Sequence, residues 1–98
     1  GETMGDPSQY VYRNYLLGAA ADLEVTTCPF RPSRIEFYVD AGASGAVGYK
    51  SDQMAGDDYF STVAGMDDGV TITDNGFELA NGADINIAAA NIHYVCHG

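Results

Sequence analysis

The residues best suited to metal chemistry stand near the end of the chain, where His93, Cys96 and His97 are close together in sequence. With the distant Cys28 they would supply four ligands of the types that bind zinc. On a strand, however, His93 and His97 point to one face and Cys96 to the other, because side chains alternate with period two. The three side chains could meet at one ion only if the strand ended or bent at Val95. We therefore expect no metal site here.

Aspartates in the second half of the chain raise the question of calcium. They are Asp52, Asp57, Asp58, Asp67, Asp68, Asp74 and Asp84. An EF-hand loop needs ligands at alternating positions, a glycine and a later glutamate, and residues 67–69 and 74–76 lack that spacing. Hairpin chemistry explains both triplets, since asparagine and glycine supply left-handed backbone angles. The carboxylates sit in turn sequences rather than beside aromatic platforms, so they indicate no glycosidase pair either.

The sequence contains no nucleophilic or phosphate-binding motif with the spacing that its chemistry requires. No serine lies in a nucleophile-elbow pattern, and the neighbours Cys96 and His97 point apart on a strand. The glycine-rich residues 41–48 precede Tyr49 and Lys50, so a phosphate-binding loop would lack both its final glycine and the helix behind it. The sequence therefore predicts no catalytic residue, no cofactor and no enzymatic activity.

The charge balance narrows the classes of partner. Lysine and arginine total 4 against 14 aspartates and glutamates, which gives a net charge of -10. Such a chain is a poor match for nucleic acid or for an anionic membrane, because both require clustered cations. Neither a membrane-spanning apolar run nor a basic-then-apolar leader is present in the sequence, so we expect no transmembrane segment and no retained signal peptide. Two of the four cations, Arg31 and Arg34, flank Pro32.

Alternation of apolar and polar residues indicates strands, most clearly over residues 28–40. Two prolines stiffen the start of this stretch, and then Ile35, Phe37 and Val39 alternate with polar or amphipathic residues. Residues 10–17 also fit helical spacing, but their aromatic and β-branched side chains favour a strand that stops at Gly18. Further strands are expected near residues 22–27, 47–50 as an edge strand, 59–64, 70–72, 77–79, 85–87 and 91–97, with turns at residues 65–69 and 88–90.

About eight short strands separated by frequent turn signals are typical of all-β proteins. At 98 residues the chain has room for one modest core. We therefore predict an all-β, single-domain antiparallel β-sandwich or jelly-roll-like barrel over residues 10–98. Residues 1–9, which are rich in glycine and small polar groups, are interpreted as an N-terminal arm that is ordered only against a partner.

Cysteine and aromatic residues are assigned to the core. Cys28 and Cys96 lie outside any Cys-x-x-Cys spacing and next to predicted strand ends, which favours buried free thiols. A bond between them would stabilise the fold by roughly 4 kcal/mol on the chain-entropy estimate, but the sequence does not place them within bonding distance. The seven tyrosines and four phenylalanines are interpreted as mainly structural, with a sugar-binding platform as the alternative.

Several short motifs carry a resemblance to a known group of proteins. They are the Phe30-Arg31-Pro32 approach with its alternating strand to Tyr38, and then residues 75–79, 83–87 and 92–95. Over roughly residues 20–98 the chain resembles the small β-proteins of tailed-bacteriophage virions. The Ala88-Ala89-Ala90 turn departs from that pattern, because a glycine-containing hairpin is expected there. The resemblance implies a structural role without a cofactor, either as a capsid decoration (cement) protein or as a module of a tail or head fibre.

From the resemblance and the charge we expect a virion protein that decorates and stabilises the outer capsid surface by bridging neighbouring major capsid subunits. It would be assembled in the host cytoplasm, and its partner would be the major capsid protein. The sequence leaves open whether the free protein is a monomer or pairs with copies of itself as a trimer. The alternative is a receptor- or glycan-binding module of a tail or head fibre. The candidate partner-binding residues are Met4, Pro7, Tyr10, Tyr12, Arg31 and Arg34. If the two arginines are paired within their own chain, their expected role is reduced to packing.

Overall fold

The computed structural model describes residues 10–98, which form nine β-strands and one short 3-10 turn. The elements are β1 (Val11–Leu17), β2 (Leu23–Val25), β3 (Arg34–Asp40), η2 (Gly42–Ser44), β4 (Val47–Ser51), β5 (Asp58–Ser61), β6 (Gly65–Asp68), β7 (Val70–Thr73), β8 (Gly76–Leu79) and β9 (Asn91–His97). Within these residues, no helix is long and apolar enough to cross a membrane. The predicted arm lies outside the described residues.

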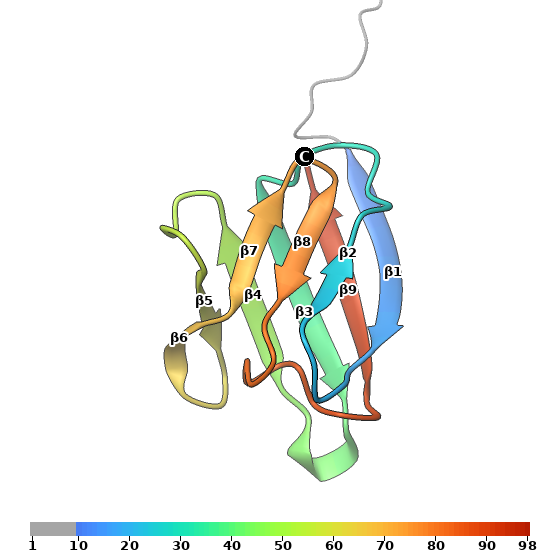
Figure 1. Cartoon of the computed structure of the whole chain (residues 1–98), viewed down its shortest axis with the longest axis vertical. Helices are drawn as coiled ribbons and strands as arrows, with labels where there is room; N and C mark the ends of the chain where they lie inside the picture. Colours follow the sequence, from blue (N-terminus) through green and yellow to red (C-terminus); the bar gives the residue numbers. More distant parts are fainter. Residues whose placement is uncertain (1–9) are drawn as a thin grey trace, which may run out of the picture.

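Two antiparallel sheets are packed face to face, as the sequence predicts. The larger sheet has the order β1-β9-β3-β4-β5-β6, and the smaller has the order β2-β8-β7. In Figure 1 the smaller sheet crosses in front of the larger one, and the chain end lies beside the start of β1. The fold is therefore an all-β sandwich in a single domain.

The strand with the strongest alternation, β3, lies in the middle of the larger sheet between β9 and β4. Its Ile35 and Phe37 are fully buried, and on β9 Ile92, Tyr94 and Cys96 face the same core. Across the sandwich, Phe77 of β8 packs edge-on against Phe37 and Tyr94, with ring centroids 5.1 and 4.9 Å apart. Such edge-to-face aromatic contacts add to the free energy of burial.

Both cysteines are buried free thiols, as predicted. Burial raises the pKa of the Cys96 thiol, and the neighbouring Cys28 acts in the same direction. Cys96 therefore stays protonated and chemically inert at neutral pH.

Three expectations about strands are wrong: the edge position of residues 47–50, the turn at residues 65–69 and the strand at residues 85–87. β4 lies inside the sheet because β5 pairs with its other side, and residues 65–68, expected to be a turn, form β6 and become the sheet edge instead. The turn lies earlier, at residues 62–64, where Ser61 Oγ accepts the Val63 N–H at 3.0 Å and Gly65 adopts a positive φ of 82°. The sequence pattern missed this because β6 contains one large apolar residue, Met66.

No strand forms at residues 85–87, where one was expected. The buried Asn86 instead anchors this segment, because its side chain binds the backbone of Ala19, Ala21 and Ala80 at 2.9–3.2 Å. These bonds satisfy a buried amide and link the segment to the chain after β1. They replace the ladder of hydrogen bonds that a strand would make.

The turn at residues 88–90 is confirmed, and it contains a strained residue. Ala89 has φ of 67°, the left-handed region in which a Cβ is disfavoured. Replacing Ala89 with glycine is expected to raise the free energy of unfolding by about 0.5–1 kcal/mol, after allowing for the greater freedom of glycine in the unfolded chain. Urea titration followed by far-UV circular dichroism measures the change. The neighbouring Ala88→Gly is the control, and a stabilisation there as well would contradict this explanation.

Candidate interaction surface

The side of the larger sheet that faces away from the smaller sheet carries most of the exposed apolar side chains; we call it the outer face. Nine large hydrophobic residues are exposed within residues 10–98, and only Val63, in the β5–β6 turn, lies elsewhere. The other eight are Val11, Tyr15, Leu17, Tyr38, Val47, Tyr49, Phe60 and Met66. Residues scattered singly would need no explanation, but a gathering on one face marks an interaction surface.

Strand register arranges six of these eight side chains in two rows across the sheet. One row runs from Tyr15 on β1 through His93 and Tyr38 to Val47 on β4. The Tyr15 and His93 rings lie 5.8 Å apart in a tilted contact. Directly opposed side chains on neighbouring strands touch, so each row is a continuous strip.

The second row reaches the far edge of the sheet. It begins at Arg13 on β1, passes Val95 and Glu36, and ends with Tyr49, Phe60 and Met66 on β4, β5 and β6. Its last three residues are 37, 41 and 59% exposed. Aromatic residues and methionine are enriched at protein interfaces, so this end of the row is the strongest candidate for contact with a partner.

A polar cluster interrupts the two rows at their centre. The Tyr38 hydroxyl donates to Glu36 Oε1 at 2.5 Å, and His97 Nε2 lies 2.7 Å from Glu36 Oε2. Arg34 Nη2 lies 3.5 Å from His97 Nδ1, at the outer limit of a hydrogen bond. The polar groups at the centre of the face are thus paired with one another.

The Tyr38 hydrogen bond, followed by His97, lowers the pKa of Glu36 below its ordinary value. A carboxyl group whose pKa is lower in the folded state stabilises the fold above its unfolded pKa. That contribution is present at neutral pH and is lost as the pH falls through the folded value. The cluster therefore contributes to stability at neutral pH and loses that contribution in acid.

The zinc-type residues do not converge. His93 and His97 lie on the outer face, whereas Cys96 is fully buried on the opposite face of the same strand. This is the arrangement that period-two alternation predicted. The histidines instead contact Tyr15 and Glu36.

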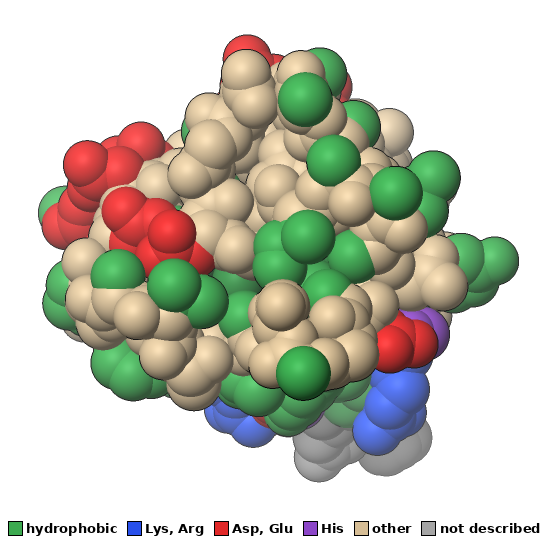
Figure 2. Space-filling model, turned by 90° about the horizontal axis from the view of Figure 1, so that it is seen from below, with side chains coloured by type: hydrophobic (Ala, Val, Ile, Leu, Met, Phe, Trp, Pro, Cys, Tyr) green, Lys and Arg blue, Asp and Glu red, His purple; other side chains and the backbone are tan. Residues whose placement is uncertain are grey.

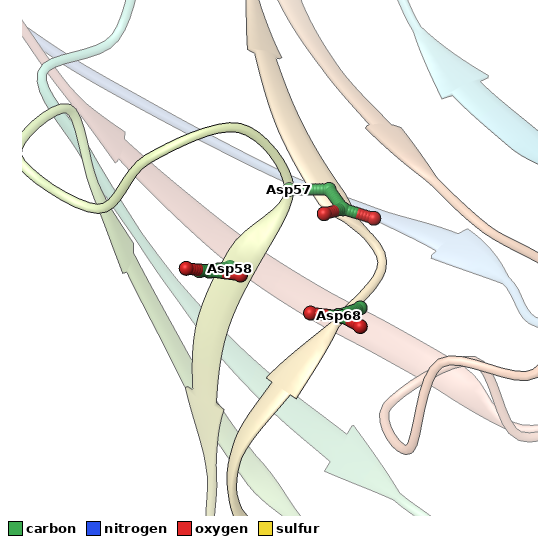
Figure 3. A group of neighbouring side chains, drawn as sticks. All are labelled: Asp57, Asp58 and Asp68. Atoms are coloured by element: carbon green, nitrogen blue, oxygen red, sulfur yellow. The ribbon is translucent and has the colours of Figure 1, made fainter.

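Three carboxylates, unlike the histidines, do come together. Asp57 and Asp58 at the start of β5 and Asp68 at the end of β6 place carboxylate oxygens within 4.8 Å of one another (Figure 3). A hydrogen bond with Asp58 and the charge of Asp57 raise the pKa of Asp68. Oxygen ligands of this kind suit Ca²⁺ or Mg²⁺. Within the described residues, however, no buried polar side chain is left without a partner to mark a site for an ion.

Acidic side chains also line a groove of about 370 Å³ over the smaller sheet, among them Asp22, Glu24, Asp57 and Glu78. Glu24 and Glu78 are directly opposed on β2 and β8. In Figure 2 acidic side chains gather on the β5–β6 side of the molecule, whereas the visible lysine and arginine side chains lie along the lower edge. Most acidic side chains of residues 10–98 thus lie off the outer face, but the β5–β6 end of that face carries Asp58 and Asp68.

The predicted partner-binding residues have separate positions. Met4 and Pro7 lie outside the described residues. The Tyr10 ring packs 5.7 Å from the ring of Phe30, and the Tyr12 hydroxyl hydrogen-bonds with Thr27 at 2.7 Å, so both tyrosines have contacts within the fold. The structure does not gather them at one surface.

The two predicted arginines differ in their contacts within the chain. Arg31 forms an ion pair with Asp74 at 2.9 Å, between side chains that are 57 and 95% exposed. Arg34 belongs to the polar cluster with His97. An exposed pair such as Arg31–Asp74 is worth about 0–1 kcal/mol. Arg31 thus meets the condition set from the sequence, whereas Arg34 has no ion pair within the described residues and stays a predicted partner-binding residue on the outer face.

The sequence interpretation missed the aromatic part of the outer face. Of the eleven tyrosines and phenylalanines, Phe37, Tyr59, Phe77 and Tyr94 are buried, but Tyr15, Tyr38, Tyr49 and Phe60 are exposed. The sequence does contain a signal for it. Val47 and Tyr49 share one face of the strand, and Gly48 between them offers no large apolar side chain to the other face, so the two large residues are left for the outer face.

No family model, curated protein or solved structure matches this chain. The function of the chain is therefore inferred from its geometry and from the expectation that its sequence motifs raised.

Proposed function

We propose that this chain is a structural protein that decorates the outer surface of a tailed-phage capsid and docks on the major capsid protein through the outer face. The observation that supports it best is the concentration of exposed apolar side chains, including Tyr49 and Phe60, on that face. A monomer gains nothing from leaving such a surface in water, whereas a protein partner would bury it.

The shape of the face favours a protein partner over a small molecule. Six strands of up to seven residues span roughly 500 Å² in projection, which approaches the scale of the about 800 Å² that each partner buries in a standard interface. The hollows of about 370 and 310 Å³ are lined by residues away from this face. Neither of these two hollows opens on the outer face, and a broad sheet surface suits another broad surface, such as a capsid shell.

The distribution of charge supports the same orientation. Across its six strands the outer face carries Arg13 and Arg34 against four carboxylates, Glu36, Asp40, Asp58 and Asp68, a formal charge of -2, while the chain as a whole has a net charge of -10. Docking through this face desolvates little net charge. The acidic groove over the smaller sheet would then face the solvent and keep neighbouring particles apart by repulsion.

The proposal is tested by adding the purified protein back to phage heads that lack it. The double variant Tyr49→Ser/Phe60→Ser is expected to bind heads at least about 100-fold more weakly, because buried aromatic anchors carry much of the affinity of an interface. Co-sedimentation over a concentration series measures the affinity. Val63→Ser removes an apolar side chain that is 60% exposed but lies off the outer face, so it is the matched control and should bind like the wild type.

Equal binding of the double variant and the wild type would exclude the outer face from capsid docking. Copy number per virion separates the two roles: hundreds of copies on the head fit decoration, and a few copies at a fibre contradict it. In the latter case the exposed tyrosines would favour the receptor- or glycan-binding alternative, because aromatic rings can stack on sugars. Binding of the isolated domain to a glycan array then measures that activity.

A further inference from the structure

The edge of the larger sheet at β1 is long and open. β1 pairs with β9 on one side, and within residues 10–98 no strand lies on its other side. The other sheet edges are the four-residue β6 and β7 and the three-residue β2, and β6 carries Asp67 and Asp68. Proteins usually shorten, charge or cover their edges to prevent pairing with another chain. Seven residues with one charged side chain make β1 the least protected edge.

Alternation of hydrogen bonds shows which backbone groups point outward. Gly18 N–H donates to Ala90 O at 2.8 Å, and Gly98 N–H donates to Tyr10 O at 2.9 Å, so the even-numbered residues of β1 face β9. The outward groups are those of Val11, Arg13, Tyr15 and Leu17. One of them, the Tyr15 N–H, is held by Asn14 Oδ1 at 2.8 Å. The side chain of Asn14 thus stands where the backbone of another strand would bind.

We propose that the partner of this edge is β1 of a second copy, antiparallel about a two-fold axis at Asn14. This register pairs all seven residues and places outward groups opposite outward groups. Val11 then faces Leu17 of the second copy, and Arg13 faces Tyr15 of the second copy. The first pair is apolar, and the second places a guanidinium beside an aromatic ring.

Self-complementarity is what selects a second copy over an unrelated strand. Arg13 is the only charged side chain of β1, and in this register it faces a tyrosine rather than another arginine. The two Asn14 side chains meet at the axis, where each can release Tyr15 N–H and bind the other amide. Pairing of two edges closes with two copies, so the assembly is a dimer.

The dimer would join two larger sheets into one, with both outer faces on the same side. Dimer formation is separate from capsid docking, because it needs no capsid protein. Each copy has a net charge of -10, so long-range repulsion opposes pairing and salt weakens that repulsion. Dimerisation is therefore expected to strengthen as the salt concentration rises, and unchanged or weaker pairing at higher salt would contradict the placement of charge in the dimer.

Sedimentation equilibrium over a concentration series tests the pairing. The wild type is expected to shift toward twice the 10.4 kDa chain mass as its concentration rises. Tyr15→Pro removes an outward N–H that β9 does not use, and proline is tolerated at such edge positions. Its dimer dissociation constant is expected to rise at least about 100-fold, since two backbone bonds are lost and the rings obstruct the second strand.

Tyr15→Thr is the matched control, because it removes the same side chain but keeps the N–H. It is expected to weaken pairing by less than about 10-fold, as threonine fits a strand. Circular dichroism checks that both variants remain folded. A wild type that stays monomeric at every concentration, or equal weakening by the two variants, would overturn edge pairing. An unchanged Tyr15→Pro variant would overturn it too.

Cross-linking tests the register independently of proline. At the axis, the Cα atoms of Asn14 in the two copies would lie about 4.5 Å apart, within the range of a disulfide, whereas those of Arg13 would be about 8 Å apart. With oxidised glutathione as the oxidant, Asn14→Cys should form a covalent dimer and Arg13→Cys should not. The two natural cysteines are buried, so the wild type shows the background level of cross-linking. Cross-linking of the Arg13→Cys variant alone would overturn the register.

Discussion

Replacing Lys50 with methionine is expected to lower the free energy of unfolding by about 3–5 kcal/mol, because it removes a buried charge from its hydrogen-bond partners. Lys50 is 1% exposed, and its ammonium group donates to the carbonyl oxygens of Met54, Gly56 and Asp58 at 2.9, 2.9 and 2.6 Å. All three donors are used. Methionine fills a similar volume but leaves three carbonyls without this donor.

The loss should extend beyond the loop that Lys50 closes. This loop leads into β5, and its Asp57 carbonyl accepts the N–H groups of Gly69 and Val70 at 2.9 and 3.1 Å. Loosening this loop would also disturb Phe60 and the β5–β6 end of the outer face. Urea unfolding followed by far-UV circular dichroism suits a chain without tryptophan.

The control for Lys50 is Arg34→Met, which removes a cation from the exposed face of the same sheet and is expected to change stability by less than about 1 kcal/mol. Burial lowers the pKa of Lys50, but Asp58 and Asp57 oppose that effect. Equal losses from Lys50→Met and Arg34→Met would show that burial and the three carbonyl contacts contribute nothing particular to stability.

Replacing Gly76 with alanine is expected to lower the free energy of unfolding by at least about 3 kcal/mol, through a steric clash that the sandwich cannot relieve locally. Gly76 begins β8 with φ of 153°, and a Cβ placed there would lie 1.9 Å from the carbonyl oxygen of Val25 on β2. Contact with backbone cannot be avoided by a rotamer change. The pair β2–β8 would have to separate, together with the bond from Cys28 N–H to Asn75 O.

A second glycine separates the clash from the backbone angle. Gly82 has φ of 98°, but a Cβ there would have no neighbour within 4 Å. Gly82→Ala is therefore expected to cost only about 1–2 kcal/mol, the usual penalty for a left-handed alanine. Thermal or urea unfolding of both variants measures the difference. If both lost the same amount, the close approach of Val25 would have no energetic role.

Gly76 also shows where local reasoning stops. The sequence correctly predicted a hairpin at residues 74–76, but for a reason that is partly wrong. Within residues 10–98, Ala89 is the one residue other than glycine with a positive φ, so Asn75 does not adopt the left-handed angle expected of it. The glycine is required instead by a strand that approaches from elsewhere in the chain. No pattern within the turn could reveal that contact.

Alternation alone determined the fold class and the orientation of the central strands. Ile35, Phe37 and Val39 are buried as their spacing predicted, and the same periodicity placed His93 and Cys96 on opposite faces. These features depend on the period-two geometry of a strand, which is a local property of the backbone. The composition likewise determined the acidic charge without any structure.

Only the tertiary structure decided which apolar side chains remain exposed. Tyr49 and Phe60 are as hydrophobic as Tyr59 and Tyr94, yet the first two face the solvent and the last two face the smaller sheet. Lys50, one of four cations in the sequence, became a buried hydrogen-bond donor because a loop closed around it. Burial depends on which segments cover which, and this is set by contacts between residues far apart in the chain. Spacing along one strand carries no information about those contacts.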